Sequence, residues 1–531
     1  MKHLSGLDAT FLHFETPEMP MHVGSLNVLQ LPKGYQGDFY EDAKAFMAGR
    51  IHLADVFTRK LALMPFDLSN PVWVDDDDID VDYHVRHITL PKPGTNRQLQ
   101  QYVARLHSSL IDRSRPLWEF YIIDGLKSGE VALYTKVHHA GIDGQAGVEV
   151  GKAIFDLEPA GRVVRPPRRK PRRSGYQLGM AELATAALRN TAAQYVKLYK
   201  MLPALGKALA DMAAAPQELP RELDPRALAR RYKLTAPRTP FNVSITNQRA
   251  FAGRTIPLAE TKAIARHFGV TLNDVVLATV SGALRQYLRA GSELPAESMV
   301  AAVPVSLREA GDDTANNQAS MILVSLASDL QDPVERLKAI NQSSTQSKST
   351  MNRFKAVILD DFPMFAAPWL MSGMASIVGR SGLVNMLPPA ANVAVSNVQG
   401  APFPMYFAGA LVTSYYPVSI ASHGTALNIT LQSYNGRLDY GLIACRRAVP
   451  DVNEIGDHLL AEHRRLMALM QEAAPAPAEK PAEAPMRERR AAPRRKAVAT
   501  ARKTAPVKAA KAAPARKKPA AAAKKAAPRG A

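Results

Sequence analysis

The decisive stretch runs from a strand pattern through two glycines into a helical pattern: Lys136-Val137-His138-His139-Ala140-Gly141-Ile142-Asp143-Gly144-Gln145. Residues 131–138 show the two-residue period of a strand, and the residues after 145 show a roughly helical pattern. Gly141 and Gly144 free the backbone to turn tightly in between. The two histidines are therefore predicted to lie where a strand ends.

This histidine pair brings together residue types needed for proton transfer. Neighbouring side chains on extended backbone point to opposite faces, so only one of His138 and His139 can serve a reacting atom. A neutral imidazole can accept a proton from a hydroxyl, which favours a general base. Two ordinary histidines at a strand end are the simpler interpretation of an isolated pair. No H-E-x-x-H or cysteine-rich spacing accompanies the pair, so we expect no metal site.

The rest of the chain alternates strand and helix patterns, which is typical of layered α/β or α+β domains. In the first part we expect strands at 24–30, 83–90, 118–124 and 131–138, and helices near 39–63 and 97–112. In the second part we expect a helix at 271–290 with Thr271 as its N-cap, strands at 300–305, 321–326, 391–398, 427–433 and 437–444, and a final helix at 452–472.

Length and composition divide the chain into four segments. Its 531 residues exceed one ordinary core. We expect an N-terminal subdomain at 1–160, a basic linker with connector helices at 161–240, a C-terminal subdomain at 241–472 and a basic tail at 473–531. The tail consists largely of Ala, Pro, Lys and Arg, so it buries too little apolar area to offset chain entropy and is predicted to be disordered.

Charge is concentrated at the C-terminal end. Residues 471–531 carry 17 Lys or Arg and 4 Asp or Glu, which leaves only +6 of the net charge of +19 for the first 470 residues. The basic segment 162–173 reads as an exposed linker. The helical pattern after it would fit either an anionic membrane surface or a connector packed between two halves. Residues 362–436 carry one formal charge, Arg380, and are predicted to form buried core or a lipid-facing surface.

Other chemistry is disfavoured. The acidic run 75–82 lacks the Gly and Glu of a calcium loop and is predicted to be a solvated turn that leads into a strand. No G-x-S-x-G motif is present, which argues against a serine hydrolase. The only cysteine, Cys445, is expected to be a packed thiol and excludes an internal disulfide. The N-terminus shows no apolar signal segment.

The HHxxxDG pattern resembles the signature of the CoA-dependent acyltransferase superfamily. Segments that match in order narrow this to a resemblance to the bacterial wax ester synthase/acyl-CoA:diacylglycerol acyltransferase family: 4–9 with 20–24, Arg115-Pro116-Leu117-Trp118, 138–144, 272–276, 303–308 and Ser396-Asn397-Val398-Gln399-Gly400. The resemblance covers about residues 1–470. It implies an α/β (α+β) fold of two chloramphenicol-acetyltransferase-like subdomains with mixed sheets.

The resemblance also implies roles for individual residues. His139 would be the general base, His138 its supporting residue, and Gly144 would permit the turn. Asp143 would be a structural acid, with an arginine such as Arg308 as its partner, because a buried carboxylate is costly unless paired. Candidates for the substrate channel are Asn273, Asp274, Ser396 and Asn397, although Asn273 fits an ordinary first-turn helix residue equally well.

The implied function is transfer of a long-chain acyl group from acyl-CoA to diacylglycerol, to a fatty alcohol, or to both, without a cofactor. Such an enzyme would be cytoplasmic and peripherally bound to the inner face of the plasma membrane or to lipid droplets. The tail would bind an anionic membrane or lipid-droplet surface, with non-specific DNA binding as the competitor. Alternatives are a non-catalytic lipid-body or nucleic-acid binding protein and a condensation-type acyltransferase with another acceptor.

Overall fold

Strand β7 (Val131–His138) is the central element of the first half, and both of its faces are buried. It pairs antiparallel with β2 (His22–Gln30) on one side and with β6 (Trp118–Asp124) on the other. The computed structural model describes residues 2–4, 6–62, 70–142, 144–166, 235–291, 293–306, 319–354 and 385–472. The tail 473–531 and most of the linker, 167–234, lie outside these residues.

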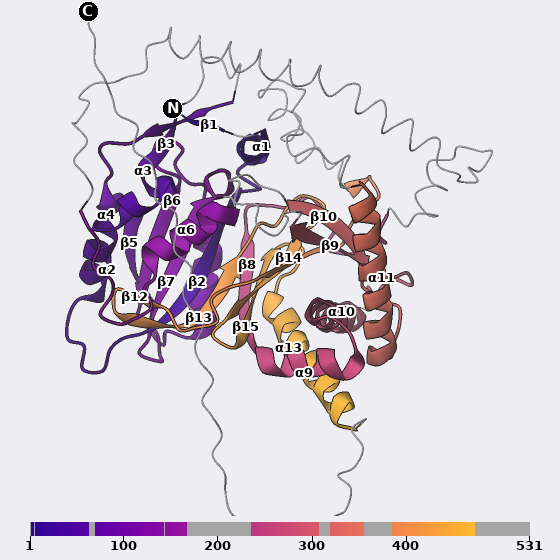
Figure 1. The fold of residues 1–531 in the computed structure, drawn as a ribbon. Coiled ribbons are helices and arrows are strands. Elements are labelled where there is room, and N and C mark those ends of the chain that lie inside the picture. Colours follow the sequence, from indigo (N-terminus) through magenta and orange to yellow (C-terminus); the bar gives the residue numbers. More distant parts are fainter. Residues whose placement is uncertain are drawn as a thin grey trace, which may run out of the picture. The chain divides into compact units, whose positions relative to one another are not determined.

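The sheet of the first half is completed by strands from the second half. Its order is β12-β13-β2-β7-β6-β5, in which β5 (Val85–Thr89) runs parallel to β6. Strands β12 (Tyr406–Phe407) and β13 (Ala410–Val418) come from far along the chain, and β13 pairs with residues 24–30 of β2 (Figure 1). The two halves of the sequence therefore share one sheet.

A second sheet forms the layer beneath the helices of the second half. Its order is β10-β9-β11-β14-β15-β8, and it mixes parallel and antiparallel pairs. The strands are β8 (Arg249–Pro257), β9 (Val300–Ser306), β10 (Ala319–Ser325), β11 (Val393–Val398), β14 (Leu427–Tyr434) and β15 (Arg437–Cys445). A small sheet near the N-terminus contains β1 (Lys2–His3), β4 (Val72–Asp75) and β3 (Arg59–Ala62).

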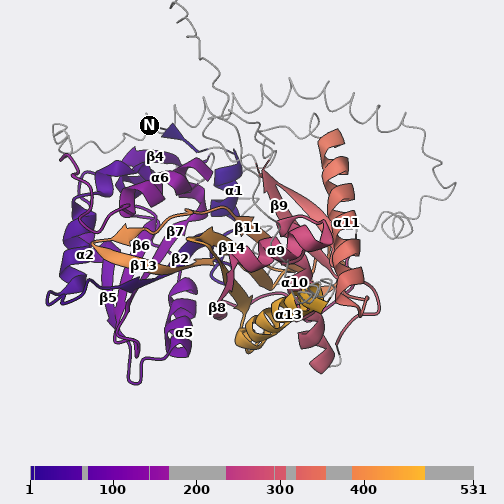
Figure 2. The same cartoon turned by 60° about the horizontal axis from the view of Figure 1, so that its bottom comes forward.

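Helix α10 (Leu272–Ala290) is the most deeply buried helix among the described residues. It packs against α9 (Leu258–Phe268), α11 (Pro333–Phe354) and α13 (Val452–Glu472), as Figure 2 shows. Thr271 caps α10 with a reciprocal capping box to Asp274, which confirms the predicted N-cap. Its twelve buried residues belong largely to the core of the second half.

The helices of the first half cover the shared sheet and its edges. They are α1 (Gly6–Phe14), α2 (Phe39–Ala48), α3 (Asp55–Thr58), α4 (Val81–His84), α5 (Asn96–His107) and α6 (Gly144–Ile154), with the short 3₁₀ turns η1 (Ile51–Leu53) and η3 (His139–Gly141). This architecture confirms the expected mixed α/β (α+β) fold with two sheet-containing halves. No helix in these described ranges is long and apolar enough to cross a bilayer.

Three predicted elements were wrong in extent. The helix expected near 97–112 ends at His107, where Ser108 is the C-cap. The helix expected near 39–63 ends at Ala48, because the chain turns at Gly49 and Arg50 into η1, α3 and the strand β3. The strand expected at 83–90 begins only at Val85, because Asp80 caps a helical turn that includes Tyr83 and His84. Part of the nearly uncharged region 362–436 forms strands of both large sheets, while residues 355–384 lie outside the described residues.

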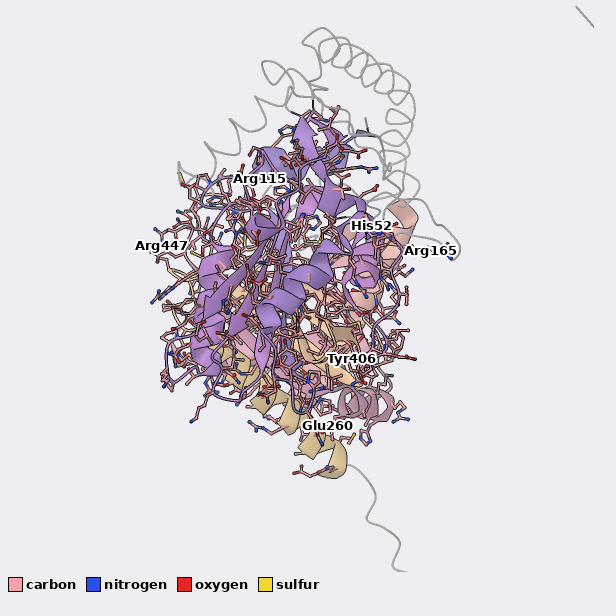
Figure 3. The ribbon with its side chains drawn as sticks, turned by 90° about the vertical axis from the view of Figure 1, so that its left-hand side faces the viewer. His52, Arg115, Arg165, Glu260, Tyr406 and Arg447 are labelled. Carbon is pink, nitrogen blue, oxygen red and sulfur yellow. The ribbon has the colours of Figure 1, made fainter. Side chains whose placement is uncertain are left out.

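Surface charges of the first half are largely paired. The acidic run after β4 contacts basic side chains, with Asp76 bound to Lys60 and Asp80 to Arg115. Most aspartates of the run are exposed, as predicted, but the run leads into the helical turn α4 and not directly into a strand. The first residues of the basic linker lie against this half, where half-buried His52 donates to the carbonyl of Arg165 over 3.0 Å (Figure 3). The boundaries of the four predicted segments stay predictions.

Candidate functional site

His138 is the last residue of strand β7, and His139 is the first residue of the turn that follows. Backbone hydrogen bonds to two neighbouring segments hold this turn. The His138 N–H donates to the carbonyl of Leu117 (2.9 Å), and the His139 N–H donates to the carbonyl of Met21 (2.8 Å). Both acceptors belong to segments that carried the family resemblance, 115–118 and 20–24. These segments therefore hold the backbone of the histidine pair from two sides.

The two imidazoles occupy different surroundings, as expected for neighbours at a strand end. His138 is fully buried, and its Nε2 lies 3.3 Å from Oε1 of Glu15. His139 lies in the turn η3, where its ring stacks on Phe11 of α1 with centroids 3.9 Å apart and 15° between the planes. Helix α1 and the residue after it thus contact both histidines.

Burial keeps His139 neutral. Removal from water lowers the pKa of His139 to about 4, its own backbone carbonyl opposes this shift, and the neighbouring His138 adds to it. The Nδ1 atom of His139 is itself buried, which leaves Nε2 as the ring nitrogen that a substrate can reach. At neutral pH the side chain is an unprotonated base beside a largely apolar wall.

Glu15 is a charged residue in this site that sequence reasoning missed. Its carboxylate accepts two hydrogen bonds from Arg113 (3.1 and 2.8 Å) and one from the Met21 N–H (3.0 Å). Burial alone would raise the pKa of Glu15, but His138, Arg113 and the Met21 amide lower it to about 2. Glu15 is therefore ionised at neutral pH.

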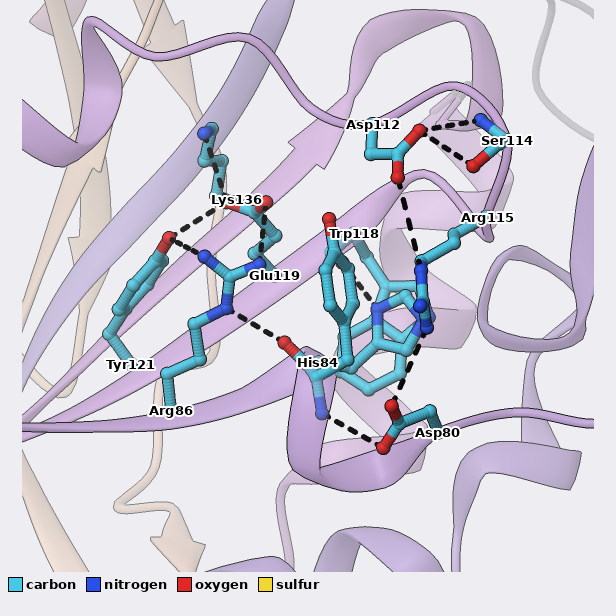
Figure 4. Close-up of polar contacts among 11 residues, drawn as sticks. Asp80, His84, Arg86, Asp112, Ser114, Arg115, Trp118, Glu119, Tyr121 and Lys136 are labelled. Atoms are coloured by element: carbon cyan, nitrogen blue, oxygen red, sulfur yellow. Dashed lines mark hydrogen bonds and ion pairs between the residues drawn. The ribbon is translucent and has the colours of Figure 1, made fainter.

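Residues of β7, β6 and β5 form a second, largely buried polar group beside the histidines. Lys136, on the same face of β7 as His138, donates to Glu119 of β6 over 3.0 Å. Arg86 and Tyr121 contact the same carboxylate (Figure 4). Burial lowers the pKa of Lys136, and Glu119 opposes that shift. All charges of this group are paired within the protein, so removing one partner would leave a buried charge uncompensated.

Several predicted site residues lie outside the described residues or away from the histidines. Asp143 and Arg308 are not described, so their pairing stays a prediction, and Gly144 begins α6. Asp274 is buried and accepts hydrogen bonds from Asn341 (2.7 Å) and Ser344 (2.6 Å), which tie α10 to α11. Burial raises the pKa of Asp274, but these hydrogen bonds and that of Thr271 lower it overall.

The other channel candidates are accessible to different degrees. Asn273 lies half-buried in the first turn of α10. On β11, Ser396 is half-buried and Asn397 is exposed. Within the described ranges, no hydrogen bond or ion pair joins any of these residues or Asp274 to His138 or His139. Their role in a substrate channel stays a prediction.

Neither a metal site nor a reactive thiol stands beside the histidines. In the described part of the chain, no group of three His, Cys, Asp or Glu side chains could hold a metal ion. Cys445 is fully buried at the end of β15, where its Sγ accepts from the Thr246 N–H over 3.4 Å. This confirms the expected packed thiol.

Comparison with known proteins gives matches over most of the chain. The family described as the wax ester synthase/diacylglycerol acyltransferase catalytic domain matches residues 4–276, and the WS/DGAT C-terminal domain matches residues 315–466. A putative diacylglycerol O-acyltransferase of Mycobacterium tuberculosis is 36% identical over 470 residues, covering 86% of this chain and 97% of the relative. The O-acyltransferase WSD of Acinetobacter baylyi is 34% identical over 472 residues, covering 87% and 96%.

A solved structure is similar over the same range. The wax ester synthase/diacylglycerol acyltransferase from Marinobacter aquaeolei VT8 has a TM-score of 0.62 and 31% sequence identity, with 88% of this chain and 100% of that chain covered. The likeness therefore extends over both halves and over the sheet that they share.

Proposed function

Because the chain belongs to the wax ester synthase/diacylglycerol acyltransferase family and is therefore an acyltransferase, we propose that it moves a long-chain acyl group from acyl-CoA to an alcohol. The acceptor is the free hydroxyl of diacylglycerol, a fatty alcohol, or both. The observation that carries this proposal is the neutral, half-buried imidazole of His139 directly after β7. No cofactor besides the co-substrate acyl-CoA takes part.

In the proposed reaction His139 acts as the general base. Its Nε2 takes the proton of the acceptor hydroxyl while the oxygen forms a bond to the thioester carbonyl carbon. The carbon–sulfur bond then breaks, and the imidazolium returns the proton to the departing thiolate, which gives an ester and free CoA. A base with a pKa of about 4 is a weak proton acceptor, so proton transfer accompanies carbon–oxygen bond formation rather than preceding it.

The other residues of the motif support this base. His138 and Glu15 lie behind it, and Phe11 covers one face of its ring. The family's motifs imply that Asp143 pairs with an arginine such as Arg308 to hold the turn, and that Asn273, Asp274, Ser396 and Asn397 border the substrate channel. These assignments rest on the match of this sequence to the family's motifs.

The product of the reaction tests this proposal directly. Radiolabelled long-chain acyl-CoA is offered with diacylglycerol, monoacylglycerol or a fatty alcohol, and the esters are separated and identified. We expect labelled triacylglycerol, wax ester or both from the full-length protein and none from His139→Ala. Release of CoA without either ester, at a rate that His139→Ala shares, would contradict the proposal.

We also propose that the enzyme works at an anionic membrane or lipid-droplet surface on the cytoplasmic side. The apolar substrates and the cationic segment 473–531 support this placement, because each basic residue near an anionic surface contributes about 1 kcal/mol. Truncation after residue 472 should leave turnover of detergent-dispersed substrate nearly unchanged but weaken salt-sensitive binding to anionic vesicles and to DNA. Salt-sensitive binding to DNA alone would instead identify the tail as a nucleic-acid segment.

A further inference from the structure

Glu15 is the most completely buried carboxylate beside the candidate base. Its side chain is 2% exposed and follows directly after α1. Arg113, which binds Glu15 through two nitrogens, also donates to the carbonyl of Leu12 (2.8 Å). The position of the carboxylate is thus fixed by the N-terminal segment itself.

The contacts of His138 determine which of its nitrogens carries the proton. The Ala140 N–H donates to His138 Nδ1 over 3.1 Å, so Nδ1 is unprotonated. Nε2, which faces Oε1 of Glu15 at 3.3 Å, is then the ring nitrogen that carries a proton. In the other tautomer, an N–H at Nδ1 would face the Ala140 N–H, and a lone pair at Nε2 would face the carboxylate.

The same contact reaches His139 through the backbone. The Ala140 N–H that His138 holds lies in the first turn of η3, the element that carries His139. Oε1 of Glu15 also accepts from the Met21 N–H, and the carbonyl of Met21 accepts from the His139 N–H. Glu15 is therefore linked to the turn of His139 by two routes, one through His138 and the Ala140 N–H and one through the backbone of Met21. Neither route involves the His139 ring.

We propose that Glu15 is a positioning residue that holds His138 in its Nε2–H tautomer and thereby fixes the turn that aims His139 at the substrate. The inference rests on the proposed role of His139 as the base. It predicts that the negative charge of Glu15 matters through His138 and not through general stability. A buried ion pair elsewhere, Arg50 with Asp156, provides the matched control because both of its side chains are about 5% exposed or less.

The first experiment compares Glu15→Gln with Asp156→Asn in the full-length protein. Glu15→Gln should lower kcat on the order of 10- to 100-fold with little change in KM, as supporting partners of catalytic histidines do. Asp156→Asn should lower the melting temperature but leave kcat per folded molecule unchanged. In a His138→Ala background, Glu15→Gln should have no further effect on kcat. An equal loss of kcat in both backgrounds would overturn the proposal.

A second variant needs no change at Glu15. In His138→Asn the amide oxygen can still accept the Ala140 N–H, whereas His138→Ala leaves that N–H without its acceptor. We expect His138→Asn to retain clearly more activity than His138→Ala. Equal activities would contradict the role given to the Ala140 contact.

Hydrogen exchange separates this inference from the proposed function, because it needs no catalysis. Peptides that span 136–142 should exchange faster in Glu15→Gln than in the wild type, and at the wild-type rate in Asp156→Asn. Unchanged exchange in Glu15→Gln would refute the positioning role even in a fully active enzyme. If no ester product formed at all, faster exchange would still support the contact between Glu15 and the turn.

Discussion

The Phe11 ring lies nearly parallel to the His139 imidazole, 3.9 Å away between centroids. This stacking contact replaces water on one face of the base, and it comes from a helix near the N-terminus. It explains in part why burial lowers the pKa of His139 to about 4. The pH range in which the base is unprotonated is therefore set by residues far from it in sequence.

Phe11→Ala should move the acid limb of activity to higher pH. The base works only when neutral, so wild-type kcat/KM should fall as pH drops toward 4, whereas water at the vacated face should bring the pKa of His139 closer to 6.5. Profiles are measured where circular dichroism shows a folded protein. The control Phe268→Ala removes another Phe that contacts a histidine, His267, and should leave the limb in place. Identical limbs in Phe11→Ala and wild type would argue against the stacking role.

The low pKa of His139 also affects stability. The folded pKa is below that of the unfolded chain, so the folded state binds fewer protons between about pH 4 and 6.5. This contribution to stability is complete above 6.5 and is lost as pH falls toward 4.

His139→Ala should remove nearly all transfer activity while the protein stays folded. A general base typically contributes on the order of 10²–10⁴ in rate. The measurement is initial-rate ester formation together with thermal melting. His87→Ala removes an exposed histidine bound to Asp124 and should retain full turnover. A His139→Ala protein with more than half of the wild-type rate would exclude the assignment of the base.

The protein should form no acyl-enzyme. Cys445 is fully buried, its Sγ accepts from Thr246, and residues of an apolar cluster surround it. Burial raises the pKa of this thiol, but hydrogen bonds from Thr246 and the following backbone lower it overall. Cys445→Ser should change activity less than about twofold, since both substrates react directly with each other. Mass spectrometry that traps an acyl thioester on Cys445 would contradict direct transfer.

Local patterns predicted the elements that carry the histidines. The strands predicted at 118–124 and 131–138 match the observed bounds of β6 and β7, although both strands are buried on both faces rather than on one. Thr271 marked the start of α10, because its side chain and that of Asp274 satisfy the first free N–H groups of the helix. Asp80 likewise marks the start of α4. If it had been interpreted as an N-cap, the strand predicted from residue 83 would have been placed after α4, where β5 begins.

Local patterns could not predict which strands far apart in the sequence pair with each other. Strand β13 joins β2 with a register shift between Val412 and Ser414, and no local feature of 410–418 specifies a partner almost four hundred residues away. Glu15 illustrates the same point for the site. It is a single carboxylate in an N-terminal segment, and only the folded chain brings it to Arg113 and His138. A buried charge that needs a partner is visible in sequence only when both partners are already suspected.

Gly282 provides the last prediction, which concerns the core of the second half. It lies within α10 where α13 passes, and a Cβ there would overlap the carboxyl group of Glu462. Glu462 forms a buried ion pair with Arg336, and both side chains are 1% exposed. Gly282→Ala should therefore displace a paired charge as well as overpack the helices, and lower the free energy of unfolding by about 1–3 kcal/mol.

The matched control is Gly151→Ala in α6, where an added Cβ meets nothing within 4 Å. There the better helix propensity of alanine should stabilise the protein by up to about 1 kcal/mol. Denaturant unfolding of the two variants measures both effects. If Gly282→Ala had the same free energy of unfolding as Gly151→Ala, the helices α10 and α13 would accommodate the added methyl group without cost. The close approach of Gly282 to Glu462 would then not matter for stability.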